Sequence, residues 1–286
     1  MREYVDLHVH STYSDGIYKP TEIVAMASKK SLRAIALADH DSVDGIDEAM
    51  AAGIILGVEV IPAVELSVAF NLYEDVHLLG YYLDHKDSKL LGKLGDFRKK
   101  RDQRGHAIIA SINDKLAKEN KGSISYEEAL ALADGALGRP HIARILMEKG
   151  FARDMQDAFT RYLLPCNVPK QYFPVAEALS EIRRLRGVAV LAHPTSISDD
   201  KNTLRTIIGE LASMGLDGIE AVNNMSNRDE STFLKKLARD KGLLITGGSD
   251  FHGIEGGIEV GICWGGASVP YGFVEDMRLH RERFET

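Results

Sequence analysis

The chain has 286 residues, which is enough for one large α/β domain or for a domain that carries an insertion. Its 44% hydrophobic and 27% charged residues argue against disorder, and its net charge of −7 argues against a nucleic-acid-binding basic face. The two cysteines, Cys166 and Cys263, are too few and too far apart for a disulfide framework. With no signal-peptide pattern and no long apolar run, we expect a cytoplasmic protein without a membrane partner.

The first predicted strand runs from Tyr4 to His10 and ends in two histidines. His8 and His10 point to the same face of an extended chain, because side chains alternate with period two. Two imidazoles that project together from a strand end make half of a transition-metal site. A lone H-x-H is nevertheless common at ordinary strand ends. The other ligands must come from elsewhere in the chain.

Strands then alternate with helices. A helix opens at Pro20, because proline suits the first turn, and an apolar strand follows that ends in Asp39-His40-Asp41. The next two strands carry Glu65 and His77 in apolar surroundings. The pattern predicts strands over 32–38, 58–68 and 76–82 and a second helix over 45–52, which favours a parallel α/β sheet or barrel.

Residues 87–173 show helix signals only, which predicts an inserted helical subdomain between the barrel segments 1–86 and 174–286. We expect long helices over 89–118 and 141–149, a helix opened by the Ser125–Glu128 capping box, and another over 154–163. The alternation then returns, with strands expected over 188–194, 217–222 and 243–246 and helices over 175–186, 203–214 and 229–241. The glycine-rich stretch 256–266 is predicted to be loop with one edge strand.

The predicted strand ends collect acids and histidines, as α/β folds do where they build their sites. Glu65 or His77 alone would more often be a satisfied structural residue. Together the residues offer enough ligands for two or three metal ions, with Glu65 as the natural bridging carboxylate. The candidate ligands are His8, His10, Asp15, His40, Glu65, His77, His193, Asp250 and His252.

These motifs, in this order, resemble those of the PHP (polymerase and histidinol phosphatase) family. The resemblance rests on the H-x-H pair, the A-D-H-D element, Glu65, His77, A-H-P and G-S-D-F-H. It implies a distorted (β/α)7 barrel with a trinuclear metal centre. It also implies three ligand sets: His8, His10, Glu65 and Asp250; Glu65, His77 and His193; and Asp15, His40 and His252.

Within that family, residues 138–144 in the helical insertion resemble the stand-alone phosphoesterase branch. The resemblance implies hydrolysis of small phosphorylated substrates, most of all nucleoside 3′,5′-bisphosphates and short oligonucleotides, and no stable nucleic-acid partner. One loop departs from the branch, because residues 223–227 read N-N-M-S-N where relatives carry a serine and a histidine. The specificity of this chain is therefore open at that loop.

The mechanism we expect is attack by a hydroxide that bridges metals at Glu65, with Glu65 and Asp250 counted as catalytic ligands. Arg139 would grip the phosphate, and His141 would bind it or protonate the leaving oxygen. Arg139 and His141 also suit a simple helix N-terminus. Arg101 is a further candidate for substrate binding, although Arg98, Arg101 and Arg104 are spaced like a solvated helix face.

Several readings stay open. A non-catalytic metal-binding PHP module would typically have lost ligands, whereas all nine are present here. A metal-dependent amidohydrolase on a related barrel commonly carries a bridging lysine, which this ligand set does not need. Histidinol-phosphate phosphatase and cyclic sugar-phosphate phosphodiesterase activities are alternatives in the phosphoester class. The two or three divalent ions are left as Mn, Fe or Zn, and the oligomeric state is undetermined.

Overall fold

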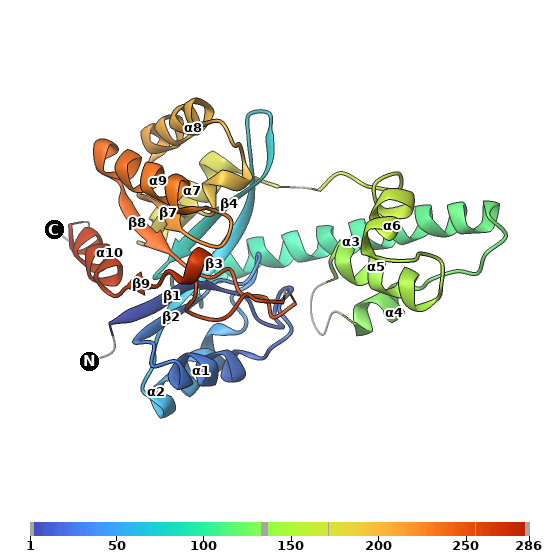
Figure 1. Ribbon diagram of the computed structural model, residues 1–286, viewed down its shortest axis with the longest axis horizontal. Helices are drawn as coiled ribbons and strands as arrows, with labels where there is room; N and C mark the ends of the chain where they lie inside the picture. Colours follow the sequence, from blue (N-terminus) through green and yellow to red (C-terminus); the bar gives the residue numbers. More distant parts are fainter. Residues whose placement is uncertain (1–2, 133–136, 171, 255, 284–286) are drawn as a thin grey trace. The chain divides into compact units, whose positions relative to one another are not determined.

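The computed structural model describes residues 3–132, 137–170, 172–254 and 256–283. The chain divides into two compact units, one made of Met1–Leu91 with Tyr172–Thr286 and the other of Gly92–Gln171. The larger unit is built on one sheet, in which the strands of the described chain follow the order β8-β7-β6-β4-β3-β2-β1-β9, with β5 paired to β3 (Figure 1). The strands are β1 (Tyr4–Val9), β2 (Ala34–Leu37), β3 (Glu59–Phe70), β4 (Tyr73–Tyr81), β5 (Phe173–Pro174), β6 (Val188–Leu191), β7 (Gly218–Val222), β8 (Leu244–Gly247) and β9 (Val269–Pro270).

Helices cover the sheet of the larger unit. Figure 1 shows α7, α8 and α9 on one side of the strands and α1 and α2 on the other. In this unit the helices are α1 (Pro20–Lys29), α2 (Ile46–Leu56), the start of α3 (Ser88–Lys118), α7 (Val175–Arg184), α8 (Lys201–Met214), α9 (Arg228–Lys241) and α10 (Gly272–Glu282). Buried apolar residues of the alternating strands, such as Leu7, Ala36 and Val190, pack together inside the sheet.

The sheet closes almost completely into a barrel whose seven strands are β1 to β4 and β6 to β8, which confirms the predicted distorted (β/α)7 fold. Neighbouring strands are parallel except around β4, which runs antiparallel to both β3 and β6, and at the edge, where β9 runs antiparallel to β1. A tight turn at Asn71, whose φ is 54°, reverses the chain between β3 and β4, so no crossover helix is needed there. The barrel closes where Val9 pairs with Phe251 and the His8 carbonyl accepts a hydrogen bond from the Asp250 N–H at 2.9 Å.

The predicted elements of the barrel are confirmed to within a few residues at their ends, with three differences. The strand carrying His77 is antiparallel, which local alternation does not reveal. The edge strand expected within 256–266 was wrong, because the pairing with β1 is made by β9, at Val269–Pro270. The short strand β5 and the C-terminal helix α10 were not predicted, since neither stands out by its pattern.

The smaller unit is helical in its described residues. It contains α3 from Gly92 onwards, followed by α4 (Tyr126–Ala131), α5 (Arg139–Glu148), α6 (Met155–Ala158) and a single wide turn at Phe159–Leu163. Its own apolar core includes Ile112, Ile142 and Tyr162. The predicted capping box is confirmed, because Ser125 Oγ accepts from the Glu128 N–H at 3.1 Å and Glu128 Oε2 accepts from the Ser125 N–H at 2.8 Å.

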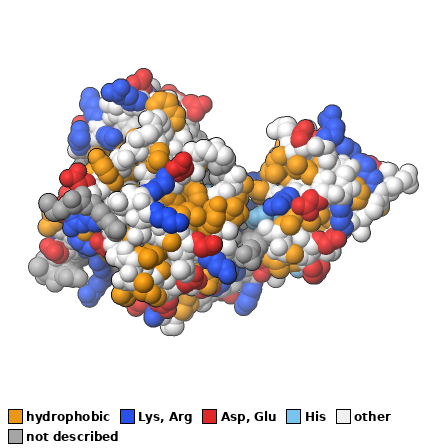
Figure 2. Space-filling model, turned by 60° about the horizontal axis from the view of Figure 1, so that its bottom comes forward, with side chains coloured by type: hydrophobic (Ala, Val, Ile, Leu, Met, Phe, Trp, Pro, Cys, Tyr) orange, Lys and Arg blue, Asp and Glu red, His pale blue; other side chains and the backbone are white. Residues whose placement is uncertain are grey.

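The surface is mixed in charge. On the face seen in Figure 2, acidic and basic side chains are interspersed among hydrophobic ones, in keeping with the net charge of −7. Among the described residues, no helix is both long enough and apolar enough to cross a membrane.

We predict that Gly248→Ala destabilises the barrel at its closing seam. A Cβ at this position would lie 2.3 Å from His8 Cβ and 2.4 Å from the His8 backbone nitrogen, and neither atom moves without shifting β1. The expected loss is about 3 kcal/mol of unfolding free energy, measured as a lower urea midpoint. Gly256→Ala is the control, since a Cβ there meets nothing within 4 Å; equal midpoints for the two variants would contradict the prediction.

Candidate metal centre

Glu65 is the hub of a buried cluster at the ends of the barrel strands. Its side chain is fully buried in β3. Oε2 lies 3.2 Å from His8 Nε2, 3.2 Å from His10 Nε2 and 3.0 Å from His40 Nδ1. Oε1 lies 2.9 Å from His77 Nδ1 and 3.0 Å from His193 Nε2. One carboxylate therefore touches five imidazoles that come from four different parts of the chain.

The alternation of the strands explains this convergence. His8 and His10 lie on one face of β1, with ring centroids 5.0 Å apart, while Leu7 and Val9 face apolar neighbours. His40 follows β2 and pairs with Glu65 in a parallel bridge. His77 reaches Glu65 because β4 returns antiparallel and places it diagonally opposite.

Two more carboxylates surround the histidines. Asp250 Oδ1 lies 3.1 Å from His10 Nε2 and 3.4 Å from His8 Nε2. Asp15 Oδ1 lies 3.2 Å from His252 Nε2, and its Oδ2 lies 3.7 Å from His40 Nε2. All nine residues proposed from the sequence thus lie in this one cluster.

Two of these residues hold a strained backbone. The φ angles of His193 and Asp250 are 25° and 54°, in a region that side chains other than glycine rarely adopt. Each such conformation costs on the order of 1–3 kcal/mol and persists only where its surroundings enforce it. These backbone conformations occur directly after β6 and β8 and direct both side chains into the cluster.

Three buried carboxylates hold the cluster from outside, and sequence reasoning missed two of them, Glu220 and Asp6. Glu220 on β7 accepts from His8 Nδ1 at 3.0 Å and from the His193 N–H at 2.8 Å. Asp6 accepts from Ser249 Oγ at 2.6 Å and from the Ser249 N–H at 2.8 Å, next to Asp250. The signal was present, because Asp6 and Glu220 are lone acids within otherwise apolar strands.

The third of these acids fixes the loop that carries Asp15. Asp39 accepts from the Ser11 N–H and Oγ, both at 2.7 Å, and from Ser14 Oγ at 2.6 Å. Its neighbour Asp41 accepts from the Ser67 N–H at 3.1 Å instead. Asp39 therefore positions the loop between β1 and α1 without touching the centre of the cluster.

The buried carboxylates of the cluster need compensating positive charge. Burial alone would raise the pKa of Glu65, but the surrounding imidazoles, His40 and His8 above all, hold that pKa well below its usual range. Burial would likewise lower the pKa of His10, yet the carboxylates of Asp250 and Glu65 beside its ring raise that pKa to about 10. Burial, assisted by repulsion from His10 and His77, lowers the pKa of His40 to about 3. Metal binding requires ionised carboxylates and neutral imidazoles, so a bound ion would take the place of the proton that His10 holds at neutral pH.

The donor atoms fit divalent metal ions. Within the described part of the chain, His8 Nε2, His10 Nε2 and Glu65 Oε2 are buried and make no hydrogen bond, which is costly unless a cation engages them. Ligand atoms fall into three overlapping groups, each with its atoms within 4.8 Å of one another. These groups are His10, Asp15, His40 and His252; His8, His10, Glu65 and Asp250; and His40, Glu65 and His77. The mixed imidazole and carboxylate donors suit Mn, Fe or Zn.

The three residues proposed to bind substrate lie in the smaller unit. Arg139 begins α5, where it is partly buried, and Arg101 lies on α3. His141 is buried in the first turn of α5, and its Nδ1 accepts from the Gly138 N–H at 3.0 Å. The neutral ring therefore carries its proton on Nε2. Of the neighbouring arginines, Arg104 binds the Val168 carbonyl at 2.6 Å, which is a structural role.

A comparison with protein families decides the membership of this chain. Residues 6–166, more than half of the chain, match the model of the PHP domain. The chain belongs to the PHP family. A 5′-3′ exoribonuclease of Haemophilus influenzae is 34% identical over 264 residues, covering 91% of this chain and 94% of the relative. A 3′,5′-nucleoside bisphosphate phosphatase of Chromobacterium violaceum is 31% identical over 264 residues, covering 90% of each chain.

Solved structures agree. A protein of Bifidobacterium adolescentis, named as a candidate metal-dependent phosphoesterase, superposes with a TM-score of 0.81 at 25% identity, covering 97% of this chain and 96% of that one. The predicted family, fold and enzyme class are thus confirmed. This PHP protein is a metal-dependent phosphoesterase with a cluster of His, Asp and Glu side chains able to bind metal.

We predict that Glu220→Gln weakens metal binding while leaving the fold intact. The amide keeps the shape of the side chain but removes the charge that makes His8 a stronger ligand. Loss of such an outer partner lowers metal affinity on the order of tenfold. Competition with a metal-binding dye measures it, with the exposed Glu282→Gln on α10 as the control; an unchanged affinity in Glu220→Gln would show that the hydrogen bond does not tune the ligand.

Proposed function

We propose that this PHP enzyme hydrolyses phosphate esters of nucleotides, with nucleoside 3′,5′-bisphosphates or short oligonucleotides as its substrates. The observation that carries the proposal is that Glu65 belongs to two of the three donor groups, and that His10 and His40 link those two groups to the third. A bridging carboxylate with imidazoles on both oxygens suits a centre of three divalent ions. The names of the exoribonuclease and bisphosphate phosphatase relatives support the nucleotide class.

The ligand assignment we propose counts all nine residues. His8, His10, Glu65 and Asp250 hold one ion, and Glu65, His77 and His193 a second, with His40 near enough to share it. Asp15, His40 and His252 hold the third, with His10 beside them. Divalent ions held there would supply a nucleophile at neutral pH and neutralise charge on the phosphoryl oxygens.

The protein's own residues then have separate tasks. Glu65 and Asp250 remain ionised at neutral pH, since the histidines hold both pKa values low against the effect of burial. The smaller unit acts as a substrate cap in this proposal. Arg139 binds the phosphate through its planar fork, with Arg101 as a further cation, and His141 donates a hydrogen bond from Nε2 to the same phosphate or to the leaving oxygen.

The first test is release of inorganic phosphate by the Mn²⁺-loaded protein from a panel of substrates. We expect kcat/KM to be highest for nucleoside 3′,5′-bisphosphates or short 5′-phosphorylated oligonucleotides, and lower for cyclic sugar phosphates and histidinol phosphate. EDTA should abolish turnover, and added Mn²⁺ should restore it, because the proposed nucleophile needs the ions. Preference for a cyclic ester or histidinol phosphate would replace the nucleotide proposal with that alternative.

We predict that Arg139→Ala lowers kcat/KM for the preferred substrate by about a hundredfold, as the loss of a charge-assisted phosphate contact does. Metal content should stay that of the wild type, because Arg139 is not among the ligand groups. Arg144→Ala is the matched control on the same helix, since Arg144 is exposed and pairs with Glu148 in the next turn. Equal kcat/KM for the two variants would leave Arg139 a helix-terminal residue only.

A further inference from the structure

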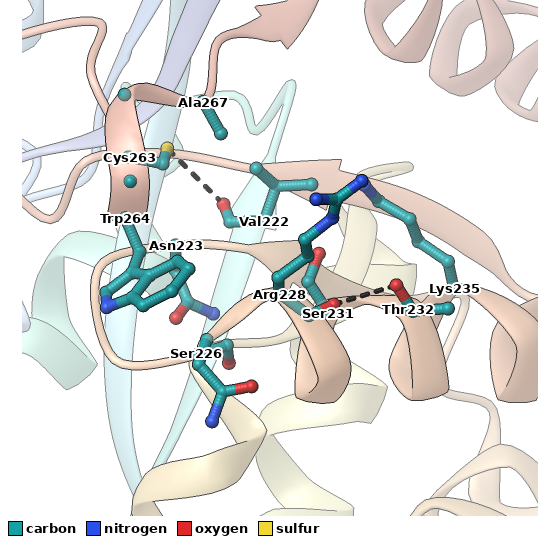
Figure 3. Close-up of a pocket in the computed structure, with 13 residues that line it drawn as sticks. Val222, Asn223, Ser226, Arg228, Ser231, Thr232, Lys235, Cys263, Trp264 and Ala267 are labelled. Carbon is teal, nitrogen blue, oxygen red and sulfur yellow. Dashed lines mark hydrogen bonds between the residues drawn. The ribbon is translucent and has the colours of Figure 1, made fainter.

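A pocket of about 380 Å³, separate from the metal cluster, lies in the larger unit between α9 and the turn that contains Trp264 (Figure 3). Its walls come from the loop after β7, from the first two turns of α9 and from residues 263–267. None of the described residues that line it is an Asp or a Glu. It is therefore a polar cavity without negative side chains on a protein whose net charge is −7.

Two cations share this pocket. Arg228 and Lys235 are seven residues apart on α9, which places them on one face of the helix, and Figure 3 shows their side chains extending toward each other. In the part of the chain that the structure describes, neither forms an ion pair. Ser231 and Thr232 add hydroxyl groups between them. Like charges that converge without an acid favour a bound anion, and the Arg fork suits a phosphate.

The remaining wall is aromatic. Trp264 is the one tryptophan in the sequence, and 49% of its surface is exposed. The turn that presents it is fixed, because Cys263 Sγ donates to the Gly248 carbonyl at 3.2 Å and the backbone of Gly265 adopts a φ of 66°. An exposed indole on a fixed turn offers a flat surface on which a nucleic-acid base of any kind stacks.

The pocket and the metal cluster share the loop of residues 223–227. Asn224 Nδ2 donates to the Ser249 carbonyl at 2.7 Å, directly before the ligand Asp250. Ser226 Oγ lies 2.9 Å from Thr195 Oγ, two residues after the ligand His193. Asn223 and Ser226 also line the pocket, so one loop separates the two sites within the same compact unit.

We propose that this pocket binds a neighbouring nucleotide of an oligonucleotide whose terminal phosphoester lies in the metal centre. Arg228 and Lys235 bind a phosphodiester of the chain, and Trp264 stacks against a base. The inference rests on the proposed function, because it extends the substrate from one nucleotide to a chain. It makes the enzyme selective for oligonucleotides over single nucleotides.

The binding test uses the intrinsic fluorescence of Trp264, which reports on the pocket and needs no turnover. We expect a phosphorothioate-linked, 5′-phosphorylated tetraribonucleotide to quench this emission, with an affinity that falls as salt is raised. The Arg228→Gln, Lys235→Gln double variant should bind on the order of tenfold more weakly. Lys236→Gln, on the next position of α9 and outside the pocket, is the control. No quenching, or equal affinity in both variants, would overturn the proposal.

The kinetic test compares two substrates in each protein. In the double variant, and in Trp264→Ala, the ratio of kcat/KM for the tetraribonucleotide to that for a nucleoside 3′,5′-bisphosphate should fall about tenfold. Trp264→Phe should keep most of the ratio, because phenylalanine still stacks. An unchanged ratio would overturn the subsite. If the wild type releases phosphate from neither substrate, the proposed function fails, while the fluorescence titration still decides whether the pocket binds an oligonucleotide.

Discussion

The contact of one buried carboxylate with five imidazoles is the constraint that organises this protein. Glu65 is fully buried, and a charge in that position is tolerated only where opposite charge or a metal ion compensates it. The compensation comes from His8, His10 and His40 on one oxygen and from His77 and His193 on the other. The ends of β1, β2 and β6 and the middle of β4 therefore have to meet at Glu65 on β3.

The fold meets this demand with rigid supports that are not ligands themselves. Asp6, Asp39 and Glu220 are buried acids that accept hydrogen bonds from the loops after β8 and β1 and from the segment after β6. Burial raises the pKa of both Asp6 and Asp39, although hydrogen bonds oppose that shift. Holding these groups in place costs stability, and so do the strained backbones of His193 and Asp250. The packed apolar core of the barrel offsets this loss of stability.

Substrate choice depends on residues outside this cluster. The relatives named as exoribonuclease and as bisphosphate phosphatase both match at least nine-tenths of this chain, so the shared fold by itself does not separate their substrates. In this chain the loop of residues 223–227 links the cluster to the cationic pocket on α9. In the proposed arrangement, a change in that loop would alter the oligonucleotide subsite while leaving the metal ligands intact.

The sequence by itself determined an α/β fold and most element positions, because period-two alternation and helix caps are local signals, and it singled out the nine acids and histidines that the structure brings together. The barrel itself followed from the resemblance to the PHP family rather than from these patterns. It did not determine that β4 runs antiparallel, that His10 and His40 each belong to two donor groups, or that Glu220 binds His8 across 212 residues. The pocket between α9 and Trp264 was also invisible in the sequence. Which distant side chains meet is decided by strand register and closure of the sheet, and these depend on packing over the whole chain.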